Sequence, residues 1–307
     1  MSEAAKVSRR VSRRAFLKLG CGALAGGAAT CLLGPVYVAQ VEPNWIEVTK
    51  IDILLPGLPT DLEGFTIAQL SDFHLGQYVS VQTVRRSTAM ANRLKAGLIV
   101  LTGDFVYGSA SYSAACAQEL GSLQARHGVY AVLGNHDVWT DADHVAANLS
   151  RVGIVVLRNE RQTIDVGDSR VSLLGIEDTG YTAGFTGGFW GDFQAMWRER
   201  SDALTTLLEG VPPDEVRLLL VHNPDFAEML PQGRIDLALC GHTHGGQVRL
   251  PLIGAPAVPS CFGQRYAGGP VQAARTVVYV NRGIGLIAPP VRFNCRPELT
   301  LLRLRRK

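Results

Sequence analysis

The side chains best suited to chemistry in this chain lie in five short motifs. Four motifs hold five of the seven histidines, and the other is a glycine followed by an aspartate. Imidazole and carboxylate groups together suit first-row divalent metals better than Ca²⁺ or Mg²⁺. Two Asp, four His and one Asn exceed what one centre needs, so the set predicts two ions, roughly 3.5–4 Å apart across a bridging carboxylate. The motifs are Asp72-Phe73-His74, Gly103-Asp104, Gly134-Asn135-His136-Asp137, His222-Asn223 and Gly241-His242-Thr243-His244.

Each motif comes just after an apolar run of the kind that forms a buried strand. In open α/β sheets, ligands bind at the carboxyl ends of the strands. We therefore expect five strands to deliver the motif side chains to one edge. A lone histidine is more often a core or turn residue, but five motifs at five strand ends favour a site. The runs are Phe65–Leu70, Leu98–Leu101, Val129–Leu133, Val216–Val221 and Ile235–Leu239.

The intervening segments complete an α/β pattern. A strand is expected at Trp45–Leu55, and short strands are expected at 154–157, 162–166 and 170–176. This βαβ run, with a more antiparallel second half, predicts a two-sheet β-sandwich flanked by helices. Helices are expected from Ser80 to about Ala96 and near Ala114–Ala125, Asp141–Arg151 and Asp192–Leu208.

The order of the five motifs, from Asp72 to His244, resembles the calcineurin-like metallophosphoesterases. The resemblance implies a four-layer αββα fold and two divalent ions, such as Mn, Fe or Zn. It implies that Asp104 bridges the ions and that His136 lies near the leaving-group oxygen. The first ion would be held by Asp72, His74, Asp104 and His244, and the second by Asp104, Asn135, His222 and His242.

Further segments resemble an exported, membrane-associated bacterial branch of that family and extend the match to about residues 43–303. Serine/threonine protein phosphatases of the superfamily have an Asp at the position of Tyr107 and a Glu at that of Asp137, so the resemblance disfavours that activity. In those phosphatases, the Asp orients the histidine of the third motif. This chain has Tyr107 at that position, so what orients His136 stays open. The segments are Gly245-Gly246-Gln247-Val248-Arg249-Leu250-Pro251, Asn281-Arg282-Gly283-Ile284-Gly285, and Pro290-Val291-Arg292-Phe293 followed by Pro297-Glu298.

The N-terminus predicts a targeting segment. Ser12-Arg13-Arg14-Ala15-Phe16-Leu17-Lys18 resembles the twin-arginine export motif, and an uncharged stretch runs from Leu19 to Gln40. That stretch is long enough to span a bilayer but glycine-rich. Both cleavage and retention as an anchor stay open, with retention slightly favoured. We divide the chain into a signal or anchor segment, 1–42, and a catalytic domain, 43–307.

Charge and cysteine content narrow the function classes. The chain has 30 Lys and Arg against 27 Asp and Glu, a net charge of +3. Removing residues 1–18, with six basic and one acidic residue, leaves a body of net charge −2. Such a body has no basic field for nucleic acid. Twin-arginine export moves folded proteins, so free, buried thiols are expected at the scattered body cysteines, with Cys240 in the core.

Two features have both a functional and a structural interpretation. Residues 180–197 mix six aromatic residues with five glycines, and this segment is either a flap for an apolar substrate or membrane, or ordinary packing. Arg249, Arg282 and Arg292 follow the motifs, and each is either a phosphate ligand or part of a structural ion pair.

We interpret the chain as an exported binuclear metallophosphoesterase, expected in the periplasm or on the outer face of the cytoplasmic membrane. Its expected partners are a phosphoester substrate, the membrane through residues 1–42, and the twin-arginine translocase. One version of the hypothesis has a lipid-linked substrate. A phosphodiester or pyrophosphate is the expected substrate. One alternative is a UDP-2,3-diacylglucosamine diphosphatase of lipid A synthesis. Another is a non-catalytic envelope-binding protein stiffened by metal.

Overall fold

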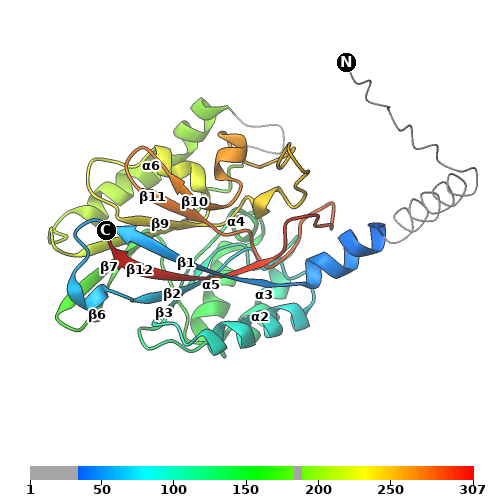
Figure 1. Cartoon of the computed structure of the whole chain (residues 1–307), viewed down its shortest axis with the longest axis horizontal. Helices are drawn as coiled ribbons and strands as arrows, with labels where there is room; N and C mark the ends of the chain where they lie inside the picture. The colour runs from blue at the N-terminus through cyan, green and yellow to red at the C-terminus, as the bar shows by residue number, and fades with distance from the viewer. Residues whose placement is uncertain (1–33, 183–188) are drawn as a thin grey trace, which may run out of the picture.

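A computed structural model describes residues 34–182 and 189–307. Two six-stranded mixed sheets form its centre (Figure 1). The first sheet has the order β1-β12-β2-β3-β4-β5, so the C-terminal strand pairs on both sides, parallel to β1 and antiparallel to β2. Its strands are β1 (Glu47–Leu55), β12 (Glu298–Arg306), β2 (Thr66–Leu70), β3 (Leu98–Thr102), β4 (Val129–Val132) and β5 (Val155–Val156).

The second sheet has the order β10-β11-β9-β8-β7-β6. Antiparallel pairs form its two margins, β10 with β11 and β6 with β7, while the central pairs are parallel. The first sheet has one antiparallel pair, so the second half of the chain is the more antiparallel one, as predicted. The strands are β10 (Gly269–Gln272), β11 (Val277–Val280), β9 (Leu237–Cys240), β8 (Val216–Val221), β7 (Ser169–Ile176) and β6 (Glu160–Val166).

Alternating side chains of the strands build three apolar layers. In β3, Leu98 and Val100 face the second sheet, whereas Ile99 and Leu101 face the helices of the first. In β8, Leu218 contributes to the layer between the sheets and neighbouring residues to the outer layer. Since successive strand residues point to opposite faces, apolar residues at consecutive positions require cover on both faces. The chain meets this need with a sheet and a helical layer, and the predicted fold class is confirmed.

Helices α2, α3 and α5 cover the first sheet and α6 covers the second (Figure 1). All four predicted helices begin within two residues of the expected start, but α3 ends at Leu120, before the expected Ala125. A short helix that the sequence patterns did not predict, α4, begins inside the third motif. The bounds are α2 (Val81–Leu94), α3 (Ser113–Leu120), α4 (Asn135–Thr140), α5 (Ala142–Arg151) and α6 (Trp190–Leu208).

Short helical turns occupy the connections. Two of them, η1 and η2, lead from residue 34 into β1. Among the described residues, no helix has the length and apolarity that crossing a bilayer requires. The twin-arginine motif and most of the uncharged stretch lie outside the described residues. The turns are η1 (Tyr37–Val41), η2 (Glu42–Asn44), η3 (Thr60–Leu62), η4 (Ala110–Tyr112), η5 (Pro224–Glu228), η6 (His244–Gly246) and η7 (Gly263–Tyr266).

The two sheets are joined at the ends where their motif-bearing strands terminate. The amide of Gln69, on β2, donates to Thr102 Oγ1 and to the carbonyl of Cys240 on β9. From β8, His222 Nδ1 lies 2.6 Å from the carbonyl of Thr102 on β3. The carboxyl edges of both sheets therefore meet, which brings motifs far apart in sequence to one place.

Candidate metal centre

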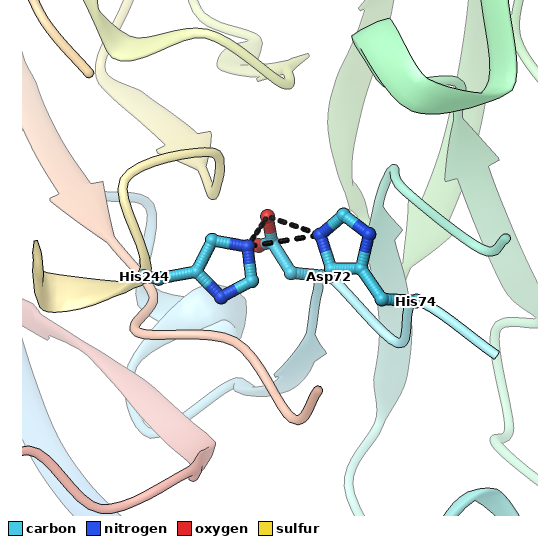
Figure 2. A group of neighbouring side chains, drawn as sticks. All are labelled: Asp72, His74 and His244. Atoms are coloured by element: carbon cyan, nitrogen blue, oxygen red, sulfur yellow. Dashed lines mark hydrogen bonds and ion pairs between the residues drawn. The ribbon is translucent and has the colours of Figure 1, made fainter. Parts of the chain in front are cut away.

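Asp72, His74 and His244 converge at the shared edge. The first two follow β2 and the third follows β9, and Figure 2 shows their side chains directed at one another. Nε2 of His74 lies 2.9 Å from Nε2 of His244, which lies 3.3 Å from Oδ1 of Asp72. All three residues are buried. Three potential ligand atoms lie within 4.8 Å of one another, in an arrangement that could hold one metal ion.

Asp104 connects this group with a second one. Its Oδ2 lies 3.4 Å from Nε2 of His74 and 3.1 Å from Nε2 of His222. Asp72, Asp104 and His222 form a further group of potential ligands. A single carboxylate oxygen thus faces the imidazoles of both groups, which is the geometry that a bridging ligand needs.

The remaining predicted ligands adjoin this carboxylate. Nδ1 of His242 lies 2.8 Å from Oδ1 of Asn135. The backbone N–H of His136, the next residue, donates to Oδ1 of Asp104 at 2.8 Å. The structure thus brings all seven predicted metal ligands to one edge, and their assignment to individual ions stays a prediction.

Five of these seven ligands have left-handed backbone. Such φ angles are uncommon for residues other than glycine and cost about 1–3 kcal/mol each unless the surroundings stabilise them. The surroundings include Asp137, whose buried carboxylate accepts from the N–H groups of Asp104, Phe105, Val106 and Gly134. The five are Asp72 (φ 52°), His74 (48°), Asp104 (57°), His242 (73°) and His244 (52°).

Glycines flank the ligands because no side chain fits there. A Cβ at Gly134 would clash with Oδ1 of Asp104, and one at Gly241 would clash with Asp72 and Ser71. The glycines before Asp104, Asn135 and His242 therefore allow loops of the two sheets to approach. The conformation of the site is determined by these contacts and by the hydrogen bonds of Asp137.

The protonation states suit metal ligands. Burial lowers the pKa of His74 and His244 well below the usual range, and that of His242 to about 3. These imidazoles are neutral and have a lone pair to offer, as metal binding requires. Among the residues that the structure describes, the ring nitrogens Nδ1 of His74 and of His244 have no hydrogen-bond partner.

His222 gives the sharpest test of whether a metal fits. Its Nδ1 must carry a hydrogen, because the Thr102 carbonyl facing it can only accept. Its Nε2 faces the Asp104 carboxylate and, at 3.9 Å, that of Asp72. Burial opposes protonation, but these two carboxylates outweigh it and raise the pKa of His222 well above its usual value. Without a metal, the proton on Nε2 supplies the positive charge that the two carboxylates attract. A metal ion could replace that proton between the carboxylates and the imidazole, so the residues fit a metal ion.

Aromatic rings surround His136. The ring centroid of Trp139 lies 4.5 Å from that of His136, and Tyr107 stacks on it at 5.3 Å. The indole N–H of Trp139 donates to the carbonyl of Gly180. The sequence left open what orients His136, and ring packing by Tyr107 and Trp139 answers that question. His136 and Trp139 are three residues apart, a spacing that places two side chains on one face of a helix and so predicts this contact.

His136 opens onto a pocket of about 180 Å³. We call it the metal pocket. Part of its lining consists of potential metal ligands, and most of the other lining residues are apolar or aromatic. None of its lining residues, within the described part of the chain, is Lys or Arg. The lining consists of Asp104, Tyr107, Asn135, His136, Trp139, Thr182, His242, His244, Pro259, Ile287 and Ala288.

The three candidate phosphate-binding arginines lie outside this lining. Arg282 forms ion pairs with Glu47 and Glu298 at 2.8 and 3.2 Å, the structural alternative that the sequence left open. Arg292 is buried and donates to backbone carbonyls, among them those of Arg282 and Gly285. Arg249 lies at the base of a tight turn.

The aromatic residues of segment 180–197 differ in whether they pack in the core or face solvent. Trp190, Phe193 and Trp197 stack in series along α6, with centroids 5.3 and 5.2 Å apart, so ordinary packing is confirmed for these residues. Phe189 is exposed. Residues 183–188, the centre of the suggested flap, lie outside the described residues. The four body cysteines are free thiols, and Cys240 packs in the core as predicted.

The fold and the cluster of carboxylates and imidazoles at its strand ends define a metal-dependent hydrolase of phosphate esters. The family model of calcineurin-like phosphoesterases matches residues 65–246, more than half of the chain. The chain therefore belongs to this family, and the resemblance stated from the motifs is confirmed. The non-catalytic alternative is wrong, since the chain is a phosphoester hydrolase.

Relatives match nearly the whole chain. It is 34% identical to the uncharacterized metallophosphoesterase YkuE of Bacillus subtilis, over 97% of this chain and 99% of that protein. It is 32% identical to the phosphodiesterase YaeI of Escherichia coli, over 96% and 99%. It is 25% identical to the UDP-2,3-diacylglucosamine pyrophosphatase LpxG of Chlamydia muridarum, over 87% and 92%.

Proposed function

We propose that this protein is a binuclear metal-dependent phosphoesterase that cleaves phosphodiesters or pyrophosphates in the cell envelope. The observation that carries the proposal is the Asp104 carboxylate, which faces the imidazoles of both His74 and His222 beside the metal pocket. When bound, two divalent ions, such as Mn, Fe or Zn, would supply Lewis acidity to the phosphoryl oxygens and to an attacking water.

The chain's own residues have distinct tasks in this proposal. Asp72, His74 and His244 would hold one ion, Asn135, His222 and His242 the other, and Asp104 both. His136, held between aromatic rings and lining the pocket, would place a hydrogen-bond donor at the leaving-group oxygen. Asp137 keeps the backbone of Asp104 in its left-handed conformation through four N–H groups.

The preference for a substituted phosphate rests on the pocket wall. A phosphomonoester is near −2 at neutral pH and a diester is −1. Since none of the described lining residues is Lys or Arg, the bound ions alone would balance the extra charge of a monoester. Tyr107, Trp139 and Ile287 instead offer apolar area to a second ester group.

Steady-state kinetics test this substrate class. We expect kcat/KM with added Mn²⁺ to be higher for bis(p-nitrophenyl) phosphate than for p-nitrophenyl phosphate, because both carry the same leaving group. A panel of other monoesters, diesters and pyrophosphates extends the comparison. A kcat/KM for monoesters above that of every diester and pyrophosphate would contradict the assignment.

A second candidate is the cleavage of UDP-2,3-diacylglucosamine, supported by the similarity to LpxG. That substrate has a pyrophosphate bond and two acyl chains, which the apolar pocket wall would suit. Nucleotide-linked lipids are made on the cytosolic face, so this role requires a catalytic domain inside the cell. Release of UMP from the purified lipid substrate, compared with bis(p-nitrophenyl) phosphate turnover, distinguishes the two candidates.

The envelope location is part of the proposal and rests on Ser12-Arg13-Arg14-Ala15-Phe16-Leu17-Lys18 and the uncharged stretch after it. The twin-arginine translocase would be the export partner. Residues 1–42 would then either be removed or remain as the membrane attachment.

A further inference from the structure

A tight turn beyond the metal ligands exposes aliphatic side chains that the catalytic proposal does not use. Residues 249–254, which we call the 249–254 turn, fold back so that Leu250 and Gly254 pair. At its tip Leu252 is 108% exposed, the highest value among the large apolar residues that the structure describes, and Ile253 is 62% exposed. Adjacent aliphatic residues held in water by a turn point to an interaction surface.

The 249–254 turn is connected through backbone hydrogen bonds to η1, near the start of the described chain. Arg249 N–H donates to the carbonyl of Phe293, an exposed aromatic residue, and Arg292 N–H donates to that of Val38 in η1. Figure 1 shows η1 at one end of the body. Two backbone hydrogen bonds, through the neighbouring residues Arg292 and Phe293, therefore connect Val38, near the end of the uncharged stretch, with the start of the exposed turn.

Charge supports an anionic partner on this side. Residues 237–297 contain six arginines and no Asp or Glu. Several of these arginines are engaged within the protein, such as Arg282 with Glu298. Arg296 lies by the same segment, with its guanidinium 3.7 Å from the ring centroid of the exposed Trp45. Exposed aliphatics, a Trp and arginines free of nearby acidic sequence are typical of a surface that contacts anionic lipid.

The same segments form part of the metal pocket. Gln247 directly follows η6, three residues after His244, and its side chain bonds the backbone of Ile287 and Pro289. Ile287 and Ala288 line the pocket. His244 lines the pocket and the turn begins five residues later, so a short stretch of chain joins the turn to the pocket lining.

We propose that the 249–254 turn, with Phe293 beside it, inserts its aliphatic tip into the surface of an anionic bilayer and holds the mouth of the metal pocket against the membrane. This contact is additional to any attachment through residues 1–42. Burying Leu252 and Ile253 in the acyl boundary removes their apolar surface from water, and Arg249 and Arg296 then lie at headgroup level.

Site-specific fluorescence on the full chain tests the contact. In a background with Cys21→Ser and Cys31→Ser, Leu252→Cys is labelled with an environment-sensitive nitrobenzoxadiazole dye. The matched control is Val155→Cys, an exposed aliphatic position on β5. The parent without an introduced cysteine measures any label at Cys261, the one body thiol that is not fully buried. Vesicles contain phosphatidylethanolamine and phosphatidylglycerol.

With vesicles, we expect the dye at position 252 to shift to the blue, brighten, and be quenched by brominated lipid, while the dye at position 155 stays unchanged. Unchanged emission at position 252 on vesicle-bound protein would overturn the proposal. The same shift in lipid-free protein at raised concentration would also overturn it, because the tip would then bind a second copy of the chain. None of these readouts depends on turnover, so the result stands apart from the proposed catalytic function.

Discussion

At the scale of single residues, Asp104 matters because one of its oxygens faces imidazoles from both sheets. We expect Asp104→Asn to lose most of its affinity for both ions, since the shared negative charge is removed. Metal analysis after dialysis measures this loss. Asp225→Asn is the matched control, because Asp225 is a buried carboxylate bonded to Ser260 and Cys261 instead. Retention of two equivalents of metal by Asp104→Asn would contradict the assignment of Asp104 as the bridging ligand.

His136 is expected to act on the leaving group. His136→Gln should lower kcat by roughly 10²–10⁴-fold, the usual contribution of a positioned acid or base. The loss should be smaller for p-nitrophenol esters, whose leaving group needs little assistance, and metal content should stay nearly unchanged. Rates across leaving groups of rising pKa measure the effect. An equal loss for all of them would indicate a role in phosphate binding.

The buried ionisable groups predict how the stability of metal-free protein depends on pH. Burial raises the pKa of Asp72 and Asp137 to about 7, and facing carboxylates raise that of His222 well above 6.5. All three bind more protons folded than unfolded near neutral pH, so their contribution falls as pH rises. The lowered pKa values of His74, His242 and His244 act in the opposite direction only below about 6.5.

Metal-free protein should therefore lose the contribution of Asp72 and Asp137 as pH rises from about 4 to about 7, and that of His222 as pH rises above about 6.5. Each group contributes a slope of up to ~1.4 kcal/mol per pH unit within its window, and a net loss is expected above about 6.5, where the three lowered histidines no longer act. Denaturant unfolding with a chelator, at several pH values, measures the slope. Adding Mn²⁺ should remove most of it, because a bound cation compensates the carboxylates. A stability that increases with alkaline pH in the chelated protein would contradict this assignment of charges.

At the scale of elements, two neighbouring aromatic residues at the start of α6 are expected to have different roles, one in packing and the other in substrate contact. Trp190 lies 5.3 Å from Phe193 and 5.0 Å from Phe262, whereas its neighbour Phe189 is exposed. Trp190→Ala should destabilise the fold by roughly 1–3 kcal/mol, less than a fully buried aromatic would. Phe189→Ala should leave the melting temperature unchanged.

The functional half of that prediction concerns Phe189. If the exposed ring meets an apolar ester group, Phe189→Ala should raise KM for lipid-linked diesters and leave bis(p-nitrophenyl) phosphate turnover nearly intact. The two substrates assayed on the same variant provide the comparison. Equal loss on both would show that the residue is structural.

At the scale of the whole molecule, the N-terminal motif predicts where the catalytic domain resides. Arg13→Lys combined with Arg14→Lys should leave folded, metal-containing protein in the cytosol, because the translocase reads the arginine pair. Protease treatment of spheroplasts, followed by detection of the catalytic domain, measures the change. Equal protease sensitivity of the variant and the parent would reject dependence on this pathway.

Much of the architecture followed from the sequence because it depends on local patterns. Apolar runs such as Leu98–Leu101 identify buried strands, and Asp104 directly after one of them must lie at a strand end. Both statements need only the pitch of a strand and the burial of its side chains. The metal-ligand residue types and their order could be predicted in the same way, because the chemistry of imidazole and carboxylate does not depend on the fold.

Only the tertiary structure decided which groups face each other across the two sheets. His222 lies against Thr102 and Asp104, residues more than a hundred positions earlier, and no local pattern carries that pairing. Arg282 and Arg292 had the same standing in the sequence as Arg249, yet carboxylates and backbone carbonyls from other segments engage the first two. Tyr107 and Trp139 pack around His136 because the loop after β3 meets helix α4, which follows β4. Such contacts depend on how whole sheets stack, so residue types and spacing specify the ligands, and packing specifies their partners.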